Sequence, residues 1–246
     1  MAGGFPIGAR VTENGAVVSG DTWLKGATSI SFHAEYAAAD DDEAIIAGTG
    51  IGSDGKPAVF GLRIRYGAVA EAELIVAREG EASLAPPSIP LKRDARFDAV
   101  VPEARRTPAA QMIAAAEAYF DGIESDVGNA IPIVETCERV ENGVQTTHSA
   151  RFSNLACNSM EPFAYITKVR DRRYPVVDEE RGVVVAFGAF DIPGGDYKRM
   201  VNGQETTRHY EPRSLFLFEA FKIVDGKIEQ IEATMRNVPL GAQTGW

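Results

Sequence analysis

The stretch Phe221-Lys-Ile-Val-Asp-Gly-Lys-Ile-Glu-Gln-Ile-Glu232 carries the strongest fold signal in the chain. Apolar and polar residues alternate on both sides of Asp225-Gly226, and Asp-Gly between such runs is typical of a two-residue hairpin turn. The sequence therefore predicts two antiparallel strands, over 214–224 and 227–236, that are joined at this turn.

Similar alternation occurs in the first third of the chain. Phe60, Leu62 and Ile64 share one face of the stretch 58–66, and Arg63 and Arg65 share the other. The stretches 29–36, 44–51 and 69–78 are also typical of strands, so an antiparallel meander is predicted there. Two further strands are predicted over 174–177 and 183–190.

One long helix is predicted from Thr107-Pro108 to about Ser125. Thr107 is a good N-cap residue, and proline is favoured in the first helical turn. Apolar side chains, among them Met112 and Tyr119, recur at helical spacing along one stripe. The stretch 129–168 shows neither period and is predicted to be irregular.

Two short stretches repeat within the chain. Arg10-Val-Thr-Glu-Asn-Gly15 recurs as Arg139-Val-Glu-Asn-Gly143, and residues 63–73 align without a gap on 222–232. This internal repeat favours a duplicated structural unit, although matches this short also arise by chance. The sequence leaves both explanations open.

A helix with an aromatic pair, followed by hairpins of the form apolar–Asp-Gly-Lys-Ile–apolar, resembles the NTF2-like (SnoaL-like) superfamily. The stretches Cys137-Glu-Arg-Val-Glu-Asn-Gly143 and Arg172-Arg-Tyr-Pro-Val-Val-Asp-Glu179 are similar to an uncharacterised branch of it. The resemblance covers about 105–240 and implies an α+β fold, a cone of curved antiparallel sheet around a helix with a small-molecule pocket. It implies a degenerate meander half over 1–100 and a complete domain over 101–246.

The amino-acid composition limits the kinds of partner that the protein is expected to bind. The net charge is -10, which argues against nucleic acid because phosphate binding needs clustered Lys and Arg. No apolar run reaches the roughly 18–20 residues that cross a bilayer, so no membrane partner is expected. The first residues lack a signal-peptide pattern, which predicts a cytoplasmic location. Cys137 and Cys157 are either bridged or simply packed close together, and the sequence does not decide between these states.

The catalytic motifs that mark most cofactor enzymes are absent from the sequence. Its three histidines show no metal-binding spacing, and there is no glycine-rich nucleotide loop and no serine-hydrolase elbow. Any enzyme here is therefore expected to use no cofactor and no metal, and to work by acid–base catalysis and charge stabilisation.

In size and general character the chain is similar to a bacterial diarylpropane lyase of that superfamily. The resemblance implies a cofactor-independent lyase that releases formaldehyde from a lignin-derived diaryl-propanediol and leaves a stilbene. Two alternatives stay open: a dehydratase or isomerase of a polyketide or terpenoid, and a non-catalytic protein that binds a ligand. A homo-oligomer acting on a small aromatic substrate is expected.

Four residues are candidates for catalysis. Arg78 shares its strand phase with apolar residues, and Glu219 interrupts an apolar strand, where burial raises the pKa of a carboxyl group. His148 follows a polar loop, and Tyr119 lies on the apolar stripe of the helix. Each also has a structural explanation: a strand-end arginine, a salt bridge, an exposed loop histidine and a core aromatic.

A further set of residues is predicted to bind substrate. These are polar groups in loops or on strands and aromatic groups that could line an apolar pocket. They are His33, Asn142, Gln145, Phe120, Arg173, Tyr174, Phe187 and Phe218. For Arg173 and Tyr174 an ion-pair network at the strand entry is the alternative, and for the phenylalanines it is simple core packing.

Overall fold

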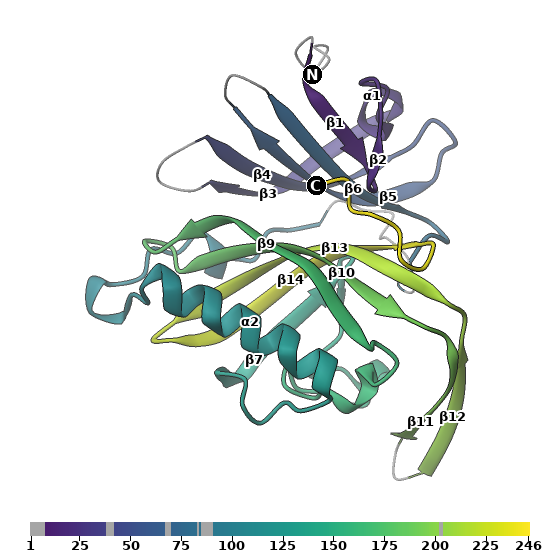
Figure 1. Cartoon of the computed structure of the whole chain (residues 1–246). Coiled ribbons are helices and arrows are strands. Elements are labelled where there is room, and N and C mark those ends of the chain that lie inside the picture. The colour runs from purple at the N-terminus through teal and green to yellow at the C-terminus, as the bar shows by residue number, and fades with distance from the viewer. Residues whose placement is uncertain (1–7, 38–41, 67–69, 83, 85–90, 202–203) are drawn as a thin grey trace.

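The computed structural model describes residues 8–37, 42–66, 70–82, 84, 91–201 and 204–246. Two six-stranded sheets lie one above the other, and the one long helix among these residues lies on the outer face of the second sheet (Figure 1). A separate two-stranded ribbon, β11 (Gly195–Val201) and β12 (Gln204–Tyr210), projects from the second sheet.

The first sheet has the strand order β2-β1-β6-β5-β4-β3. Its strands are β1 (Arg10–Glu13), β2 (Ala16–Val17), β3 (Ser29–Ala37), β4 (Glu43–Ile51), β5 (Pro57–Arg65) and β6 (Glu71–Arg78). Strands β3 to β6 form the antiparallel meander that the sequence predicts. Strand β1 pairs parallel with β6, so the sheet is mixed. A short helix, α1 (Trp23–Gly26), follows β2.

The second sheet has the order β8-β7-β14-β13-β10-β9. Its strands are β7 (Ile133–Glu141), β8 (Val144–Gln145), β9 (Lys168–Asp178), β10 (Val183–Ile192), β13 (Arg213–Val224) and β14 (Lys227–Val238). The hairpin at Asp225-Gly226 joins β13 to β14, as predicted. The helix α2 (Ala109–Ser125) precedes this sheet, and short 3-10 turns lie at 95–97, 103–105, 150–152 and 161–163.

The expected NTF2-like cone is wrong. Strands dominate the described residues, and their two helices have 4 and 17 residues. Both sheets are mixed rather than antiparallel, because β1 and β7 pair parallel with β6 and β14. Helix α2 covers one face of the second sheet, and the first sheet covers the other, so the molecule is layered. The division at residues 100 and 101 stays a prediction.

The repeated stretches occupy equivalent positions in the two sheets. In both, an Asn-Gly turn follows the strand that pairs parallel with the last strand of the sheet. Asn14 and Asn142 have φ values of 51° and 48°. The side-chain oxygen of Asn14 accepts the Val76 amide at 2.9 Å, and that of Asn142 accepts the Met235 amide at 2.8 Å. The strand order and these turns therefore match from one sheet to the other.

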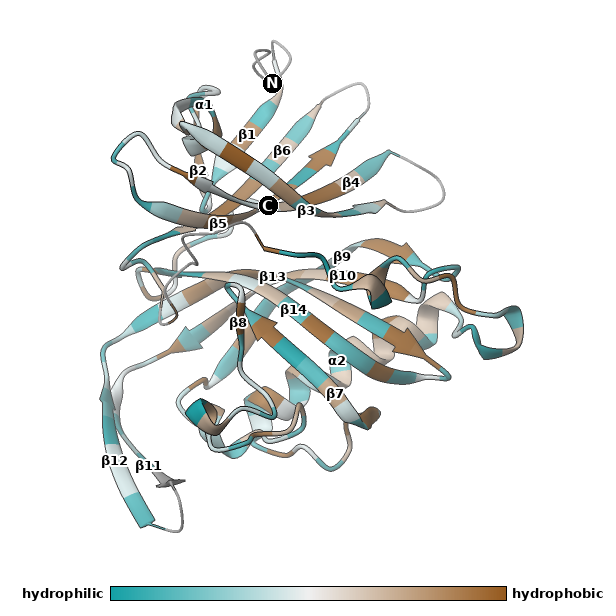
Figure 2. Cartoon of the chain, turned by 180° about the vertical axis from the view of Figure 1, so that it is seen from behind, coloured by the Kyte–Doolittle hydropathy of each residue, from teal (hydrophilic) through white to brown (hydrophobic). Residues whose placement is uncertain are grey.

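Alternation along the strands supplies both layers with apolar side chains. In β13, Leu217 and Phe221 pack with α2, whereas Phe216 and Phe218 pack against the first sheet. Figure 2 shows the corresponding alternation of apolar and polar bands along β14. The sheets approach closely at Gly61, where a Cβ atom would overlap the ring of Phe218. Glycine is therefore required there for space.

Charged residues also lie between the sheets, on the face of β5 and β6 that is opposite to Phe60 and Leu62. Arg63 and Glu73 are 6% and 4% exposed, because the second sheet covers them. Arg173 of β9 donates two hydrogen bonds to Glu73, both at 2.8 Å. Arg63 is paired with Glu43 and Glu71 within its own sheet. Burial of these charges is tolerated because they are paired.

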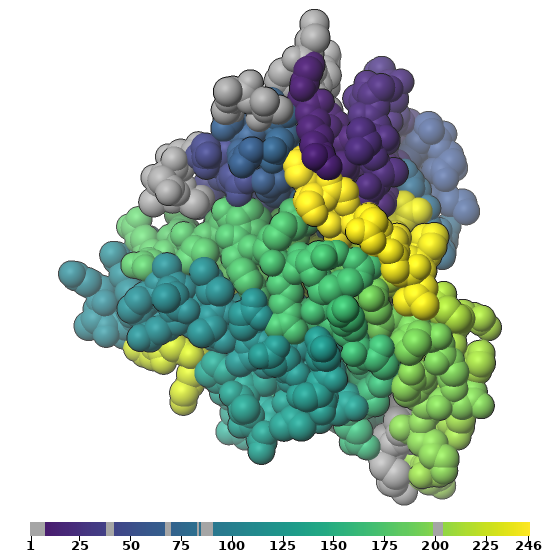
Figure 3. Space-filling view, in the orientation of Figure 1, coloured from purple at the N-terminus to yellow at the C-terminus, as the bar shows by residue number. Residues whose placement is uncertain are grey.

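The last residues of the chain return to the first sheet. The segment 239–246 leaves β14 and crosses the boundary between the two sheets (Figure 3). The indole of Trp246 donates to the Thr12 hydroxyl at 3.0 Å, and the guanidinium groups of Arg10 and Arg63 lie over its ring. This segment therefore fastens the second sheet to β1.

Cys137 and Cys157 form a disulfide, which settles the question that the sequence left open. The bridge links β7 to the loop before β9. Disulfides are rare in cytosolic proteins, so this bond weighs against the cytoplasmic location, which stays a prediction. No helix in the described part of the chain combines the length and the apolar character needed to cross a membrane.

Candidate functional site

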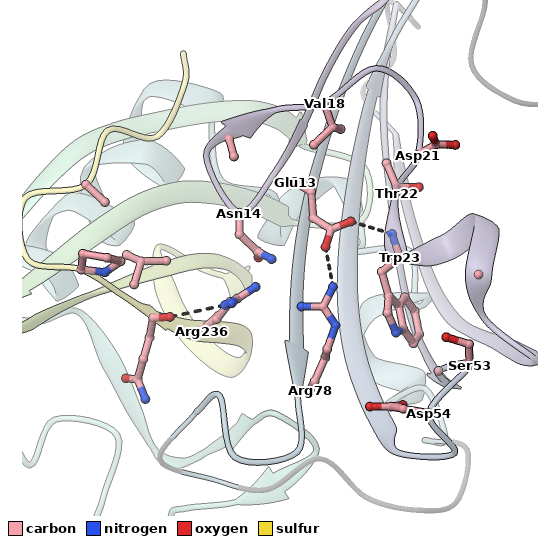
Figure 4. Close-up of a pocket in the computed structure, with 17 residues that line it drawn as sticks. Glu13, Asn14, Val18, Asp21, Thr22, Trp23, Ser53, Asp54, Arg78 and Arg236 are labelled. Atoms are coloured by element: carbon pink, nitrogen blue, oxygen red, sulfur yellow. Dashed lines mark hydrogen bonds and ion pairs between the residues drawn. The ribbon is translucent and has the colours of Figure 1, made fainter.

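A cleft of about 720 Å³ lies at one end of the boundary between the sheets (Figure 4). The first sheet contributes the β1–β2 turn, α1, the turn at 52–54 and the end of β6, and the second contributes the end of β14 and the segment after it. Six of its polar or aromatic residues carry the argument below: Glu13, Asn14, Trp23, Asp54, Arg78 and Arg236.

Four charged residues at this cleft form a series of ion pairs: Glu13, Arg78, Glu81 and Arg236. Glu13 accepts the Trp23 backbone amide at 2.6 Å and pairs with Arg78 at 2.5 Å (Figure 4). Arg78 pairs with Glu81 at 3.2 Å, and Glu81 also pairs with Arg236 at 3.2 Å. Two carboxylates and two guanidinium groups therefore neutralise one another and join β1, β6 and β14.

Several hydrogen-bond donors at the cleft have no partner among the residues that the structure describes. Among the described residues nothing accepts a bond from Nδ2 of Asn14, from the indole Nε1 of Trp23 or from Nη1 of Arg236. Asn14, Trp23 and Arg236 are each partly exposed. Donors from three elements are thus available to a ligand with acceptor oxygens.

The pKa of Arg236 reflects both its burial and the charges around it. Partial burial lowers the pKa of Arg236, the carboxylates of Glu81 and Glu13 oppose that shift, and the positive charge of Arg78 adds to it. Trp23 adds a flat apolar surface in the same cleft, with Phe60 behind its ring.

Of the four residues predicted to be catalytic, only Arg78 lies in this cleft. His148 is exposed on its loop, where Nε2 lies 3.0 Å from the carbonyl oxygen of Cys137. Glu219 and Tyr119 are buried between β13 and α2. The predicted set is therefore divided among three places.

Glu219 and Tyr119 share their buried position with Arg139, which the sequence analysis missed. Arg139 donates to the Tyr119 hydroxyl at 3.2 Å and pairs with Glu141 at 2.8 Å. Burial raises the pKa of Glu219 to about 8, Glu141 adds to the shift, and Arg139 opposes it. Burial also raises the pKa of Tyr119 well above its usual range. At neutral pH Glu219 is therefore mostly protonated in the folded protein.

The residues predicted to bind substrate have mainly structural contacts. Asn142 forms the turn after β7, and Gln145 bonds to the Thr147 carbonyl at 3.3 Å. Arg173 pairs with Glu73 between the sheets, and Tyr174 is half-buried near α2. The three phenylalanines lie in the core: Phe120 of α2 packs against the second sheet, and Phe187 and Phe218 lie between the sheets.

His33 is the exception among them. The sequence places it on the polar face of its strand with Ser31 and Glu35, yet the imidazole is buried between the sheets and borders a second cavity of about 580 Å³.

The cleft residues Glu13, Asn14, Trp23 and Arg236 were not predicted as site residues. Asn14 carried one usable signal, the repeated Asn-Gly turn. The others depend on contacts between segments far apart in the sequence, such as the pair formed by Glu81 and Arg236.

Comparison with known proteins gives limited information. A model of the family described as "Domain of unknown function (DUF8021)" matches residues 105–235. No curated protein matches the chain.

Two solved structures show a weak likeness. AclR from Streptomyces galilaeus, described as a candidate hydroxylase, is 15% identical with a TM-score of 0.36, over 54% of this chain and 83% of its own. TerC, crystallised with polyporic acid, is 17% identical with a TM-score of 0.30, over 50% and 89% of the two chains. Likeness at this level supports no statement about activity. The family match covers more than half of the 246 residues, and the chain belongs to the DUF8021 family.

Proposed function

We propose that the protein binds a small organic acid in the cleft between the sheets, a molecule with a carboxylate and a flat apolar part. The observation that carries this proposal is a group of three donors on Asn14, Trp23 and Arg236, which border one cleft and have no acceptor within the described part of the chain. Hydrogen bonds from such donors to a carboxylate are stronger than those to neutral oxygens.

In this proposal each part of the ligand has its own contacts. Arg236 offers Nη1 to one carboxylate oxygen, and the Asn14 amide is available to the other. The ring of Trp23 offers a surface for an aromatic group, and aromatic rings in such contacts are worth about 0.5–1.5 kcal/mol beyond the area they bury. Asp54 lies beside Trp23 and would accept a bond from a hydroxyl group at that end.

Fluorescence tests this proposal, because Trp23 is one of only two tryptophans in the chain. Phenylacetate is titrated into the protein, with phenylacetamide as the uncharged counterpart. The acid is expected to change the emission, and the amide to bind roughly 10-fold more weakly or worse, since hydrogen bonds to charged groups contribute about 1.5–3 kcal/mol. The variant Trp23→Phe is expected to lose the signal.

Arginine variants supply the matched control. Arg236→Gln is expected to weaken binding of the acid about 10-fold or more and to leave binding of the amide unchanged. Arg65→Gln removes an arginine that pairs with Glu71 and does not border the cleft, and it is expected to bind normally. Equal affinity of the acid and the amide, or equal weakening by both variants, would contradict the proposal.

The lyase reaction expected from the sequence stays a prediction, as does the dehydratase or isomerase alternative. Arg78 is already paired with Glu13 and Glu81, and His148 does not border the cleft. The two groups assigned to that chemistry therefore do not meet at this site. Incubation with a diaryl-propanediol, followed by assays for formaldehyde and for stilbene absorbance, tests the reaction directly.

A further inference from the structure

The ribbon formed by β11 and β12 leaves the second sheet from a packed base. The ring of Tyr210 stacks on that of Tyr165 with the centroids 4.0 Å apart, and Tyr197 meets Tyr210 edge-on at 5.8 Å. Tyr165 belongs to the loop before β9. Tyr210 is buried, whereas every residue of β12 before it is exposed. The base of the ribbon is therefore fixed to the body of the protein, and the rest of β12 is open to solvent.

This ribbon lacks the support that a two-stranded sheet normally needs. β11 and β12 pair with each other along their whole length, and neither pairs with any other strand in the described part of the chain. A hairpin of two strands is only marginally stable in water, and further strands or a covering element supply the missing contacts. An open strand edge is also a template for another strand. The ribbon is therefore suited to gain a strand from a partner.

The edge of β12 is the more accessible of the two edges. In both views β12 lies on the side of the ribbon that faces away from the rest of the molecule, and β11 lies on the side toward it (Figures 1 and 2). A partner strand can therefore pair with β12 without displacing another part of this chain.

Symmetry limits how a second copy of the chain can pair with this edge. Hydrogen-bonded and non-hydrogen-bonded residue pairs alternate along an antiparallel ladder, so two identical strands related by a two-fold axis place one residue opposite its own copy. If the whole strand takes part, that residue is the midpoint of Gln204–Tyr210, which is Thr207. The midpoint of β11 is Lys198, where two like charges would oppose each other. Full overlap therefore suits β12 and not β11.

The sequence of β12 is complementary to itself in this register. Thr207 lies opposite Thr207 of the copy, and Glu205 lies opposite His209 on both sides of that pair. Threonine pairs and opposite charges are both favourable across antiparallel strands. A centre at Glu205 or Arg208 would place like charges opposite each other, and a centre at Thr206 would leave Glu205 opposite Thr207. The register with full overlap is thus also the one that pairs opposite charges.

Glu205 and His209 are positioned for these pairs. Their side chains are 59% and 61% exposed, so a partner can reach both. Within the ribbon Glu205 pairs with Lys198 at 2.8 Å, and His209 pairs with Asp196 at 2.7 Å. The hydrogen bond to Asp196 raises the pKa of His209, which favours the charged imidazolium. All four side chains lie on one face of the ribbon, so pairing with a copy places positive and negative groups in alternation.

We propose that β12 is an interaction surface for a second copy of this chain, and that two ribbons pair antiparallel through β12 with Thr207 at the centre. The result is a four-stranded sheet shared by two subunits. The same edge is used by both copies, so the assembly closes as a dimer. The pairing does not involve the cleft at Trp23 and does not depend on ligand binding there.

A variant with a shortened ribbon tests whether the ribbon carries the dimer. Gly195 and Tyr210 are paired, so residues 196–209 can be replaced by an Asn-Gly turn between them. In sedimentation velocity the wild-type protein is expected to reach twice the mass of one chain as its concentration is raised. The shortened variant is expected to keep the mass of one chain. Circular dichroism and the melting transition check that its sheets are folded.

Introduced cysteines test the register in the full-length protein. Both natural cysteines are in the disulfide, so an added thiol is the only free one. Thr207→Cys is expected to cross-link two copies under mild oxidation, because side chains directly opposite each other lie close together. Lys198→Cys is the matched control, since residue 198 pairs with Thr207 inside the ribbon but lies on β11. The two copies of β11 would be about 14 Å apart, which a disulfide cannot span.

Charge variants separate this pairing from loose association. Glu205→Gln removes a charge pair at two places in the dimer and is expected to weaken dimerisation roughly 2- to 30-fold. Lys198→Gln breaks the same ion pair within the ribbon but leaves Glu205 available to His209 of the copy, so it is expected not to weaken dimerisation.

Three results would overturn the proposal. The first is a wild-type protein with the mass of one chain at every concentration. The second is a dimer that persists in the folded shortened variant. The third is equal cross-linking of Thr207→Cys and Lys198→Cys, and this comparison decides the matter even if the shortened variant does not fold. Equal weakening by the two charge variants would exclude the pairing of Glu205 with His209.

Discussion

Gly61 and Phe218 meet at the boundary between the sheets, and the ring of Phe218 occupies the space where a Cβ atom of residue 61 would lie. Both positions are buried, so neither the ring nor the strand can move away into solvent. Gly61→Ala is expected to destabilise the protein by about 1–3 kcal/mol, the usual cost of overpacking a core. Urea unfolding measures the loss. The double variant Gly61→Ala with Phe218→Leu is expected to recover part of it, and a simple sum of the two losses would contradict the steric explanation.

The buried carboxyl group of Glu219 makes stability depend on pH. Burial raises its pKa from an ordinary value of 4.5 to about 8 in the folded protein. Below pH of about 4.5 both states carry the proton. Between that pH and about 8 the unfolded state releases it and the folded state keeps it, so the free energy of unfolding falls as pH rises.

Glu219→Gln is expected to flatten this fall, by up to a few kcal/mol between pH 5 and 8, since each pKa unit corresponds to about 1.4 kcal/mol. Unfolding in urea at the two pH values measures the effect. Glu211→Gln, at an exposed carboxylate, is expected to keep the wild-type slope. An equal slope in wild type and Glu219→Gln would show that Glu219 does not hold its proton.

The pair of Arg173 and Glu73 joins the sheets through two hydrogen bonds. Arg173→Met is expected to cost about 2–3 kcal/mol, because Glu73 stays buried after its main partner is lost. Lys198→Met, which breaks an exposed pair with Glu205, is expected to cost less than about 1 kcal/mol. Equal losses in the two variants would mean that the pair between the sheets is no stronger than a surface ion pair.

The disulfide closes a loop with a sequence separation of 20. Replacing Cys137 and Cys157 by Ser is expected to lower the free energy of unfolding by about 3 kcal/mol, because the unfolded chain gains freedom. Thermal unfolding with and without a reductant checks this in the wild-type protein. The double variant is the control, since its melting temperature should not respond to the reductant.

Much of the local structure could be predicted from the sequence. The helix at 109–125 and the strands at 29–37, 43–51 and 213–224 lie within one or two residues of their predicted ranges. Their periods are set by neighbouring residues, which the sequence displays. Strand β7 was missed within the stretch predicted to be irregular, because its parallel partner β14 lies almost 100 residues later.

The packing of the two sheets on each other could not be predicted from the sequence. The cleft depends on this packing, because both sheets contribute residues to it. Arg63 and Glu73 are typical of an outward face, and only the second sheet with Arg173 makes that face an interior. The alternation of β3 predicts His33 outside, and a one-residue bulge reverses it. Arg78 was found from its phase among apolar residues, but its partner Glu81 and the nearby Arg236 became visible only in three dimensions.

The bond from Trp246 to Thr12 spans 234 positions of the chain. During synthesis β1 leaves the ribosome long before Trp246 is made, so the first sheet lacks this contact until then. Pairing over such separations is slow, and exposed strand edges invite association with other chains meanwhile. We expect nascent chains that still lack residues 239–246 to be more prone to aggregate than chains that contain them.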